Sequence, residues 1–226
     1  MHPPKAVVLD FNGTLSDDEP LLLELLTRAL AEEGVELDPD FYAENLLGLS
    51  DTEVVSRALE RAGAEADPER RDRILRAKID AYREEIGREP RISPEAVEFV
   101  RALSSEVPLA VSSSAFAEEV ETALELARIR EHFVALVTLE DLDRGKPDPE
   151  GYDLALAHIN QHRPLARSIV AHDALAVEAT AAGVAAARAA GLRCAAIAGD
   201  VRAERAAHFV IDRLDAEAAR RILERP

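Results

Sequence analysis

Cysteine, long apolar runs and basic charge are all scarce in this chain of 226 residues. Cys194 is the single cysteine, which excludes an internal disulfide and suits a reducing compartment such as the cytoplasm. No apolar run approaches the roughly 20 residues that a membrane-spanning helix needs. The net charge of -17 argues against a nucleic-acid partner, because binding that backbone requires clustered Lys and Arg. We therefore expect a cytoplasmic protein without a membrane or nucleic-acid partner.

What is present indicates a folded, globular chain. Hydrophobic residues make up 47% and charged residues 31%, and the length suits one or two domains with a full core. Only three of the 27 basic residues are lysines, a bias that fits a GC-rich bacterial genome. Residues 1–4 lead directly into an apolar strand pattern, so we expect no signal peptide.

The most informative stretch lies near the start, over residues 5–15. An apolar run of strand type ends in Asp10, which is how a parallel strand delivers a carboxylate to the carboxyl edge of a sheet. Gly13 permits a tight turn and a close approach of the backbone to a ligand, and Thr14 adds a hydroxyl. The alternative interpretation is an ordinary buried strand that ends in a polar turn.

Helical and strand patterns divide the chain unequally. Between residues 17 and 91 only helical patterns occur. We expect these helices over about 21–34, 39–47, 51–62 and 68–86. Strands alternate with helices afterwards, which predicts an α/β fold with a parallel sheet. We expect those strands at 107–111, 133–138, 174–178, 193–198 and 208–211. An all-helical insert therefore follows the first strand.

Charged residues of the insert have simple expected roles. Asp17 and Asp18 suit the capping of the helix that follows them. Arg57, Arg61 and Lys78 could reach an anionic substrate, but charges on helix surfaces are usually solvated, and we expect that here.

Polar groups stand at four strand ends or adjoining loops: Asp10, Ser113, Lys146 and Glu178. In a parallel sheet these ends share one edge, so the four groups can converge. An aspartate can attack phosphorus and form an acyl-phosphate, and a lysine with a hydroxyl can hold phosphoryl oxygens. Two carboxylates can hold Mg²⁺.

Four segments in this order resemble the motifs of the haloacid dehalogenase superfamily: residues 10–15 (Asp-Phe-Asn-Gly-Thr-Leu), Ser113 after its strand, residues 145–149 (Gly-Lys-Pro-Asp-Pro) and residues 178–183 (Glu-Ala-Thr-Ala-Ala-Gly). The insert resembles the helical cap of the β-phosphoglucomutase-like branch. The resemblance covers essentially the whole chain. It implies a Rossmann-like core of residues 1–16 and 92–226 and a mobile helical cap of residues 17–91. It also implies Mg²⁺ and phosphate-ester hydrolysis through an aspartyl-phosphate.

The resemblance assigns roles to individual residues. Asp10 would be the nucleophile. Phosphate would be bound by Lys146, Ser113, Ser114, Gly13 and Thr14. The Mg²⁺ ligands would be Asp10, the backbone carbonyl of Asn12, and Glu178.

Two positions depart from the family pattern. Phosphatases carry a second aspartate two positions after the nucleophile, which protonates the leaving group and then deprotonates water, and this chain has Asn12 there. An amide does neither near neutral pH, and loss of a general acid–base group costs about 10² to 10⁴ in rate. The second metal carboxylate is also missing, because Ala179 follows Glu178. We therefore expect weakened activity and a weakened metal site.

An alternative assignment places the fourth motif at residues 172–173, where Asp173 would repair the metal site. The spacing of Gly183 and Gly191, and the strand after them, favour Glu178 instead.

Three functions fit these residues. The leading hypothesis is an Mg²⁺-dependent phosphatase of a small phosphorylated metabolite, acting as a monomer or weak dimer. Asn12 and Ala179 equally suit a catalytically impaired relative that binds a phosphorylated ligand or a partner protein. A 2-haloacid dehalogenase is the third, because a halide leaving group needs no proton.

Overall fold

The computed structural model describes residues 2–65, 67–162 and 168–224, and a six-stranded parallel sheet forms the centre of this described part. The strand order is β3-β2-β1-β4-β5-β6, and every neighbouring pair is parallel. The strands are β1 (Ala6–Leu9), β2 (Leu109–Ser112), β3 (Phe133–Val137), β4 (Ala174–Glu178), β5 (Arg193–Ile197) and β6 (Phe209–Ile211). The predicted α/β, Rossmann-like fold is confirmed, with strand limits shifted by at most two residues.

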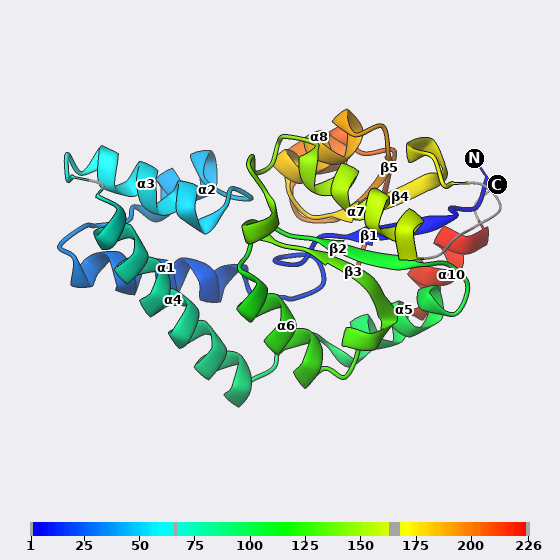
Figure 1. Ribbon diagram of the computed structural model, residues 1–226, viewed down its shortest axis with the longest axis horizontal. Coiled ribbons are helices and arrows are strands. Elements are labelled where there is room, and N and C mark those ends of the chain that lie inside the picture. Colours follow the sequence, from blue (N-terminus) through cyan, green and yellow to red (C-terminus); the bar gives the residue numbers. More distant parts are fainter. Residues whose placement is uncertain (1, 66, 163–167, 225–226) are drawn as a thin grey trace.

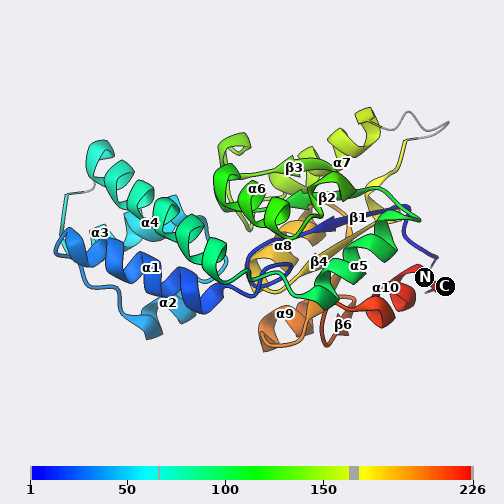
Figure 2. The ribbon, with the colours of Figure 1, turned by 90° about the horizontal axis from the view of Figure 1, so that it is seen from below.

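Helices cover both faces of the sheet (Figures 1 and 2). On one face lie α5 (Pro94–Ser104), α6 (Ala117–Leu126) and α10 (Ala216–Glu224), and on the other α7 (Glu150–His162), α8 (Ala181–Ala189) and α9 (Val201–Ala206). Successive side chains of β1 alternate between these faces, so Val7 and Leu9 join one core cluster while Ala6 and Val8 join the other. Three short 3-10 helices complete this part: η1 (Arg130–His132), η2 (Leu139–Asp141) and η3 (Ala171–Asp173). The six-residue helix α9 was not among the predicted elements.

Four helices follow β1 and lie together at one end of the molecule (Figure 1). These are α1 (Glu19–Glu32), α2 (Pro39–Asn45), α3 (Asp51–Arg61) and α4 (Pro68–Arg88), here called the α1–α4 bundle. The bundle has an apolar cluster of its own, to which Leu30, Leu46 and Leu59 contribute. Among the described residues of 17–91 there is no strand. The order of elements thus places a helical bundle beyond the carboxyl end of β1.

Caps explain several helix starts. The side chains of Asp38, Ser50, Asp67 and Ser93 each accept a hydrogen bond from a backbone N–H of the first turn, at the starts of α2, α3, α4 and α5. From the sequence, residues 161–173 are expected to form a long connection before β4, and residues 163–167 of this range lie outside the described residues.

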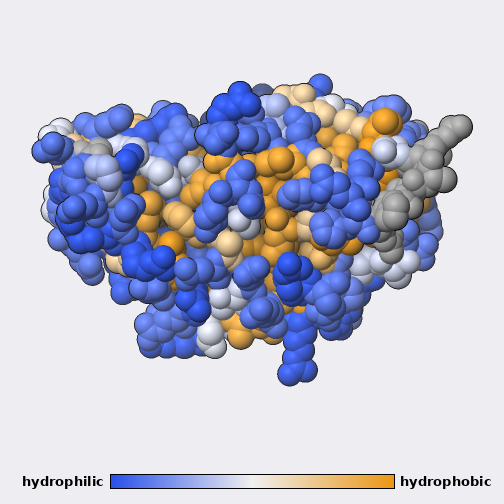
Figure 3. All heavy atoms as spheres, in the orientation of Figure 1, coloured by the Kyte–Doolittle hydropathy of each residue, from blue (hydrophilic) through white to orange (hydrophobic). Residues whose placement is uncertain are grey.

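The surface differs between the two ends of the molecule. Hydrophilic residues dominate the surface of the α1–α4 bundle, whereas apolar residues reach the surface over the middle of the face drawn in Figure 3, where Figure 1 places β3 and its neighbouring helices. In the part of the chain that the structure describes, no helix has the length and apolarity to cross a membrane.

Two charged residues of the insert lie elsewhere than expected. Asp18 precedes α1 but its side chain caps nothing; it is fully buried and accepts a hydrogen bond of 2.5 Å from the hydroxyl of Tyr82. Lys78 is only 1% exposed, and its Nζ lies 2.6 Å from Asp51 Oδ2 and 2.8 Å from Glu119 Oε1. The predictions of a capping Asp18 and a solvated Lys78 are therefore wrong, because α4 packs against α1, α3 and α6 and buries that face.

Candidate active site

Asp10 follows the last residue of β1 and meets Lys146 from the loop before α7. Lys146 Nζ lies 2.6 Å from Asp10 Oδ1, and the hydroxyl of Thr14 donates a hydrogen bond of 2.8 Å to Oδ2. Parallel strands deliver their ends to one sheet edge, which explains why residues 136 positions apart meet here. Together these two contacts hold both oxygens of the Asp10 carboxylate.

Glu178, the last residue of β4, holds Lys146 from the other side. Its Oε1 lies 2.6 Å from Lys146 Nζ and accepts a hydrogen bond of 2.5 Å from the hydroxyl of Tyr152. Burial raises the pKa of Glu178, as does the charge of Asp10, and Lys146 opposes that rise. Burial alone lowers the pKa of Lys146, but the two carboxylates outweigh it, so the pKa lies above its ordinary value and the ammonium form persists.

Gly183 leaves room for the Glu178 carboxylate under the start of α8. A Cβ at position 183 would lie 2.0 Å from Glu178 Cδ, which no packed side chain tolerates. The other oxygen, Oε2, accepts hydrogen bonds from the backbone N–H groups of Ala179 and Thr180. Glu178 is fully buried and does not line the cavity described next, so its role in this structure is to position Lys146.

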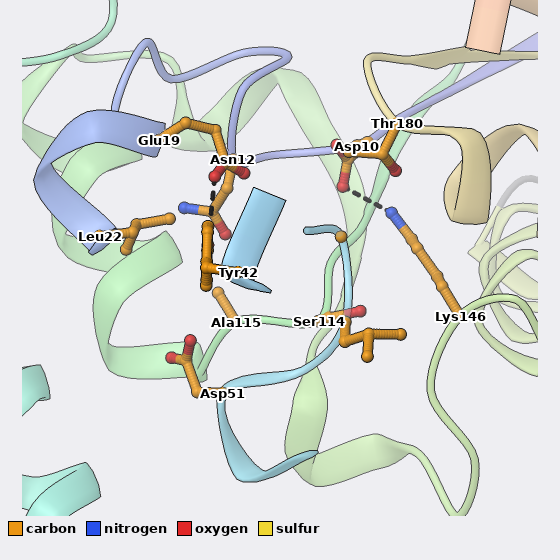
Figure 4. Close-up of a pocket in the computed structure, with 12 residues that line it drawn as sticks. Asp10, Asn12, Glu19, Leu22, Tyr42, Asp51, Ser114, Ala115, Lys146 and Thr180 are labelled. Carbon is orange, nitrogen blue, oxygen red and sulfur yellow. Dashed lines mark hydrogen bonds and ion pairs between the residues drawn. The ribbon is translucent and has the colours of Figure 1, made fainter. Parts of the chain in front are cut away.

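A small cavity of about 30 Å³ lies beside Asp10, between the sheet edge and the α1–α4 bundle (Figure 4). Its lining comes from both parts: Asp10, Asn12, Ser114, Ala115, Lys146 and Thr180 from the sheet side, and Glu19, Leu22, Tyr42, Gly48, Leu49 and Asp51 from the bundle and its loops. A volume of this size holds roughly two water molecules. A larger ligand can enter only if the bundle moves away from the sheet edge.

The two predicted serines lie differently. Ser114 lines the cavity, and its Oγ is buried without a hydrogen-bond partner among the described residues. Ser113 does not line the cavity, and its Oγ accepts a hydrogen bond of 3.0 Å from the backbone N–H of Ala115. A buried hydroxyl without a partner costs free energy, so Ser114 marks a place for a polar ligand group.

The other predicted phosphate-binding groups, Gly13 and Thr14, do not line the cavity. The N–H of Gly13 donates to the backbone oxygen of Ser16 at 2.8 Å and faces Asp18 Oδ1 at 3.4 Å. Gly13 has a φ of +69°, which glycine adopts without strain. Thr14 acts on Asp10, as described above. The structure thus brings Asp10, Asn12, Ser114 and Lys146 together at the cavity and leaves Gly13, Thr14, Ser113 and Glu178 behind it.

Glu19, the first residue of α1, was not singled out by the sequence. Its carboxylate lines the cavity, and its Oε2 accepts a hydrogen bond of 3.3 Å from the hydroxyl of Tyr42 (Figure 4). Burial, followed by the charges of Asp18 and Asp10, raises the pKa of Glu19 to about 7. An acid in the first turn of a helix suits the helix dipole whatever its function, so the sequence carried no separate signal for this role.

The oxygen donors at the cavity suit a weakly held Mg²⁺ ion. Asp10 offers its carboxylate, and in the described structure the backbone carbonyl of Asn12 accepts no hydrogen bond. Glu178 is turned toward Lys146, and Ala179 offers no side-chain donor. The described residues contain no cluster of three His, Cys, Asp or Glu side chains able to hold a metal. Mg²⁺ retains several waters and binds through one or two carboxylates with substrate phosphate, which two donors can satisfy.

Asp173, the alternative metal ligand, lies at the opposite end of β4. Its carboxylate is 2.6 Å from Lys5 Nζ and 2.7 Å from His2 Nε2. Glu178 lies five positions further along the chain at the other end of this extended strand, a span of roughly 16 Å. In this structure Asp173 therefore has no part in the cavity.

Comparisons with known proteins identify a family for the chain. Residues 7–197 match a family model described as haloacid dehalogenase-like hydrolase. A phosphorylated carbohydrates phosphatase of Thermotoga maritima is 28% identical over 189 residues, covering 83% of this chain and 82% of the relative. A validoxylamine A 7′-phosphate phosphatase of Streptomyces hygroscopicus is 28% identical over 193 residues, covering 84% of each chain.

Solved structures show the same fold. A β-phosphoglucomutase from Clostridium difficile superposes with a TM-score of 0.82 at 20% identity and covers 97% of both chains. CbbY from Rhodobacter sphaeroides, in complex with phosphate, superposes with a TM-score of 0.79 at 24% identity, covering 93% of this chain and 95% of that one. At these identities the likeness concerns the fold alone.

Proposed function

The chain belongs to the haloacid dehalogenase-like hydrolase family and is a phosphatase-like hydrolase, and from this premise we propose that it hydrolyses a small phosphorylated carbohydrate through an aspartyl-phosphate on Asp10. The observation that carries the proposal is the pairing of Asp10 with Lys146 at a cavity that also contains the unpartnered Ser114 hydroxyl.

The proposed reaction begins with attack of Asp10 on phosphorus. The hydrogen bond from Thr14 to Oδ2 and the ion pair with Lys146 hold the carboxylate in one orientation. Lys146 neutralises charge on the phosphoryl oxygens, and Ser114 Oγ donates to one of them. The oxygen of the sugar leaves, and water then releases inorganic phosphate from Asp10.

We propose that the α1–α4 bundle is a mobile cap of this core, over the predicted range 17–91. Gly48, in the loop between α2 and α3, lies against Thr180 at the start of α8. The cavity is small in this conformation and is lined from both sides. Closure excludes water from the reacting groups and brings bundle residues to the substrate.

Mg²⁺ is the proposed cofactor. Asp10 and the Asn12 carbonyl would hold it, completed by water and phosphate oxygens, and when bound it neutralises phosphate charge. Removal of divalent cations by a chelator is then expected to lower turnover, and added Mg²⁺ to restore it with weak affinity, since position 179 lacks a carboxylate.

The substrate class follows from the relatives and from the cavity. The two relatives quoted above act, by their names, on phosphorylated carbohydrates and on validoxylamine A 7′-phosphate. Glu19, Tyr42 and Asp51 offer hydrogen-bonding groups from the bundle side of the cavity, which suit the hydroxyl groups of such compounds.

The test is release of inorganic phosphate from a panel of monosaccharide and polyol phosphates, with Mg²⁺ present, by the wild-type chain and by Asp10→Asn. We expect turnover of at least one sugar phosphate that Asp10→Asn abolishes. Equal background rates for the two proteins would contradict the proposal. Halide release from 2-chloropropionate without metal is measured beside it, because such release would favour the dehalogenase alternative.

A further inference from the structure

Three carboxyl groups line the cavity: Asp10, Glu19 and Asp51. Asp10 is paired with Lys146 and Asp51 with Lys78, each at 2.6 Å. Glu19 has no ion-pair partner among the described residues; its one hydrogen-bond partner is the hydroxyl of Tyr42. A cation in contact favours the ionised form of a carboxyl group, and Glu19 is the lining carboxyl group that lacks such a contact. Glu19 is therefore the lining acid free to exchange a proton.

The reaction needs such a group because position 12 cannot provide it. The amide of Asn12 neither gives nor takes a proton near neutral pH, and its nitrogen already donates to Asp18 Oδ2 at 3.0 Å. Asp18 itself is fully buried, held by Tyr82, and does not line the cavity. Neither residue can reach a leaving group in the cavity with a proton.

On the basis of the proposed phosphatase function, we propose that Glu19 is the general acid and base of the reaction, in the place of the aspartate that position 12 lacks. In the first step Asp10 Oδ forms a bond to phosphorus while the bond from phosphorus to the sugar oxygen breaks. The electron pair stays on that oxygen, which takes the proton of Glu19. In the second step Glu19 takes a proton from water, the water oxygen bonds to phosphorus, and the Asp10–phosphorus bond breaks.

The size of the cavity supports this role. Asp10 and Glu19 line the same cavity, which holds roughly two water molecules, so the acid and the nucleophile face one small space in which the leaving oxygen would lie. Tyr42 donates to Oε2, which leaves Oε1 as the atom available for proton transfer.

The charges around Glu19 also support its role as general acid and base. Burial, Asp18, Asp10 and Asp51 raise the pKa of Glu19, and the hydrogen bond from Tyr42 opposes this rise. A general acid works best when its pKa lies near the operating pH. A protonated Glu19 also reduces the negative charge that an incoming phosphate meets, since Lys146 is the one basic residue among the described lining residues.

The experiment compares Glu19→Gln with wild type on two substrates in the presence of Mg²⁺. One is the sugar phosphate that wild type turns over, whose alkoxide must be protonated. The other is p-nitrophenyl phosphate, whose phenolate leaves without a proton. Single-turnover rates measure the first step alone. We expect Glu19→Gln to slow hydrolysis of the sugar phosphate about 10²-fold or more and hydrolysis of p-nitrophenyl phosphate only a few-fold. We also expect the wild-type rate to decline above neutral pH and the Glu19→Gln rate not to do so.

Two controls separate proton transfer from a structural role. Glu24→Gln makes the same change on an exposed side chain of α1 and should match wild type on both substrates. Asn12→Asp and Asp18→Asn are added together to Glu19→Gln, because a new carboxyl at position 12 that faces an amide instead of a carboxylate should restore turnover of the sugar phosphate if proton transfer is what was lost. Loss of packing at Glu19 would not be restored.

The outcomes are distinct. If wild type equals Asp10→Asn on every substrate, the proposed function and this inference both fail. If wild type is active and Glu19→Gln slows both substrates equally, slows neither, or is not rescued by Asn12→Asp combined with Asp18→Asn, the inference alone fails. Selective loss on the sugar phosphate with rescue supports it.

Discussion

The side-chain nitrogen of Asn12 lies 3.0 Å from Asp18 Oδ2, and it donates a hydrogen bond to this fully buried carboxylate. The pair is complementary because the amide is a donor and the carboxylate an acceptor. A carboxylate at position 12 would face another carboxylate instead.

This contact limits what Asn12→Asp can achieve alone. Burial already raises the pKa of Asp18, and a second carboxyl in contact would raise the pKa of one of the two further. We expect a modest gain in turnover from Asn12→Asp, and a larger one from Asn12→Asp combined with Asp18→Asn. The double change keeps the hydrogen bond with its direction reversed. Steady-state rates of wild type, both single variants and the double variant measure this. A double variant no faster than Asn12→Asp would contradict it.

Gly48 is predicted to be essential for closure of the bundle over the sheet edge. A Cβ there would lie 2.8 Å from Thr180 Oγ1, and the φ of Gly48 is +84°. Gly34 has a φ of +75° with nothing within 4 Å of its Cβ position, so Gly34→Ala measures backbone strain alone, about 1 kcal/mol of stability. We expect Gly48→Ala to lower kcat/KM well beyond Gly34→Ala, measured on the same substrate. Equal effects of the two variants would contradict a role of this contact in closure.

Lys78 is predicted to stabilise the junction of the bundle and α6. Its Nζ pairs with Asp51 and Glu119, and its side chain is fully buried. Lys78→Met leaves two buried carboxylates without a cation, which costs about 3–5 kcal/mol of unfolding free energy. Burial raises the pKa of Glu119, and loss of the cation raises it further. The folded variant therefore holds a proton on Glu119 at low pH, and it loses stability as this proton is released at higher pH. Denaturant unfolding should show that Lys78→Met loses more unfolding free energy, relative to wild type, at pH 8 than at pH 5. Adding Glu119→Gln should reduce the deficit at pH 8.

Glu19 is predicted to make the protein less stable as pH rises through neutrality. The folded state holds the pKa of Glu19 at about 7 against an ordinary value of 4.5. Between these values the unfolded chain has released the proton that the folded chain keeps, so stability falls with rising pH, by up to about 3 kcal/mol. Glu19→Gln removes this loss. In metal-free buffer the variant should gain stability over wild type between pH 4 and pH 8, whereas Glu24→Gln should not. A pH-independent difference would contradict the raised pKa.

Much of the fold and part of the site followed from local patterns. Apolar runs with polar ends predicted the strands, and because parallel strands end at one sheet edge, the meeting of Asp10 with Lys146 was predictable. The family match and the relatives confirm the resemblance that the four motifs indicated. Of the neighbouring serines, Ser114 rather than Ser113 lines the cavity, and the turn after β2 decides this.

The remaining features depend on how the bundle packs against the sheet. The pattern of its own helix predicts that Lys78 is an exposed charge. In the structure Lys78 is buried, where Glu119 of α6 pairs with it. The sequence pattern gives Asp18 and Glu19 no role beyond that of acids at the start of a helix. Their positions beside Asn12 and in the cavity depend on contacts with Tyr82 and Tyr42, which lie 64 and 23 residues away in the sequence.

The most direct test of the account is to trap the covalent intermediate. The wild-type chain is mixed with a substrate labelled with ³²P on its phosphate, quenched in acid within milliseconds, and digested for peptide mapping. The account predicts label on the peptide that contains Asp10, released by hydroxylamine as an acyl-phosphate is, and absent from Asp10→Asn. Turnover without any label on this peptide at any time, or label on another residue, would contradict Asp10 as the nucleophile.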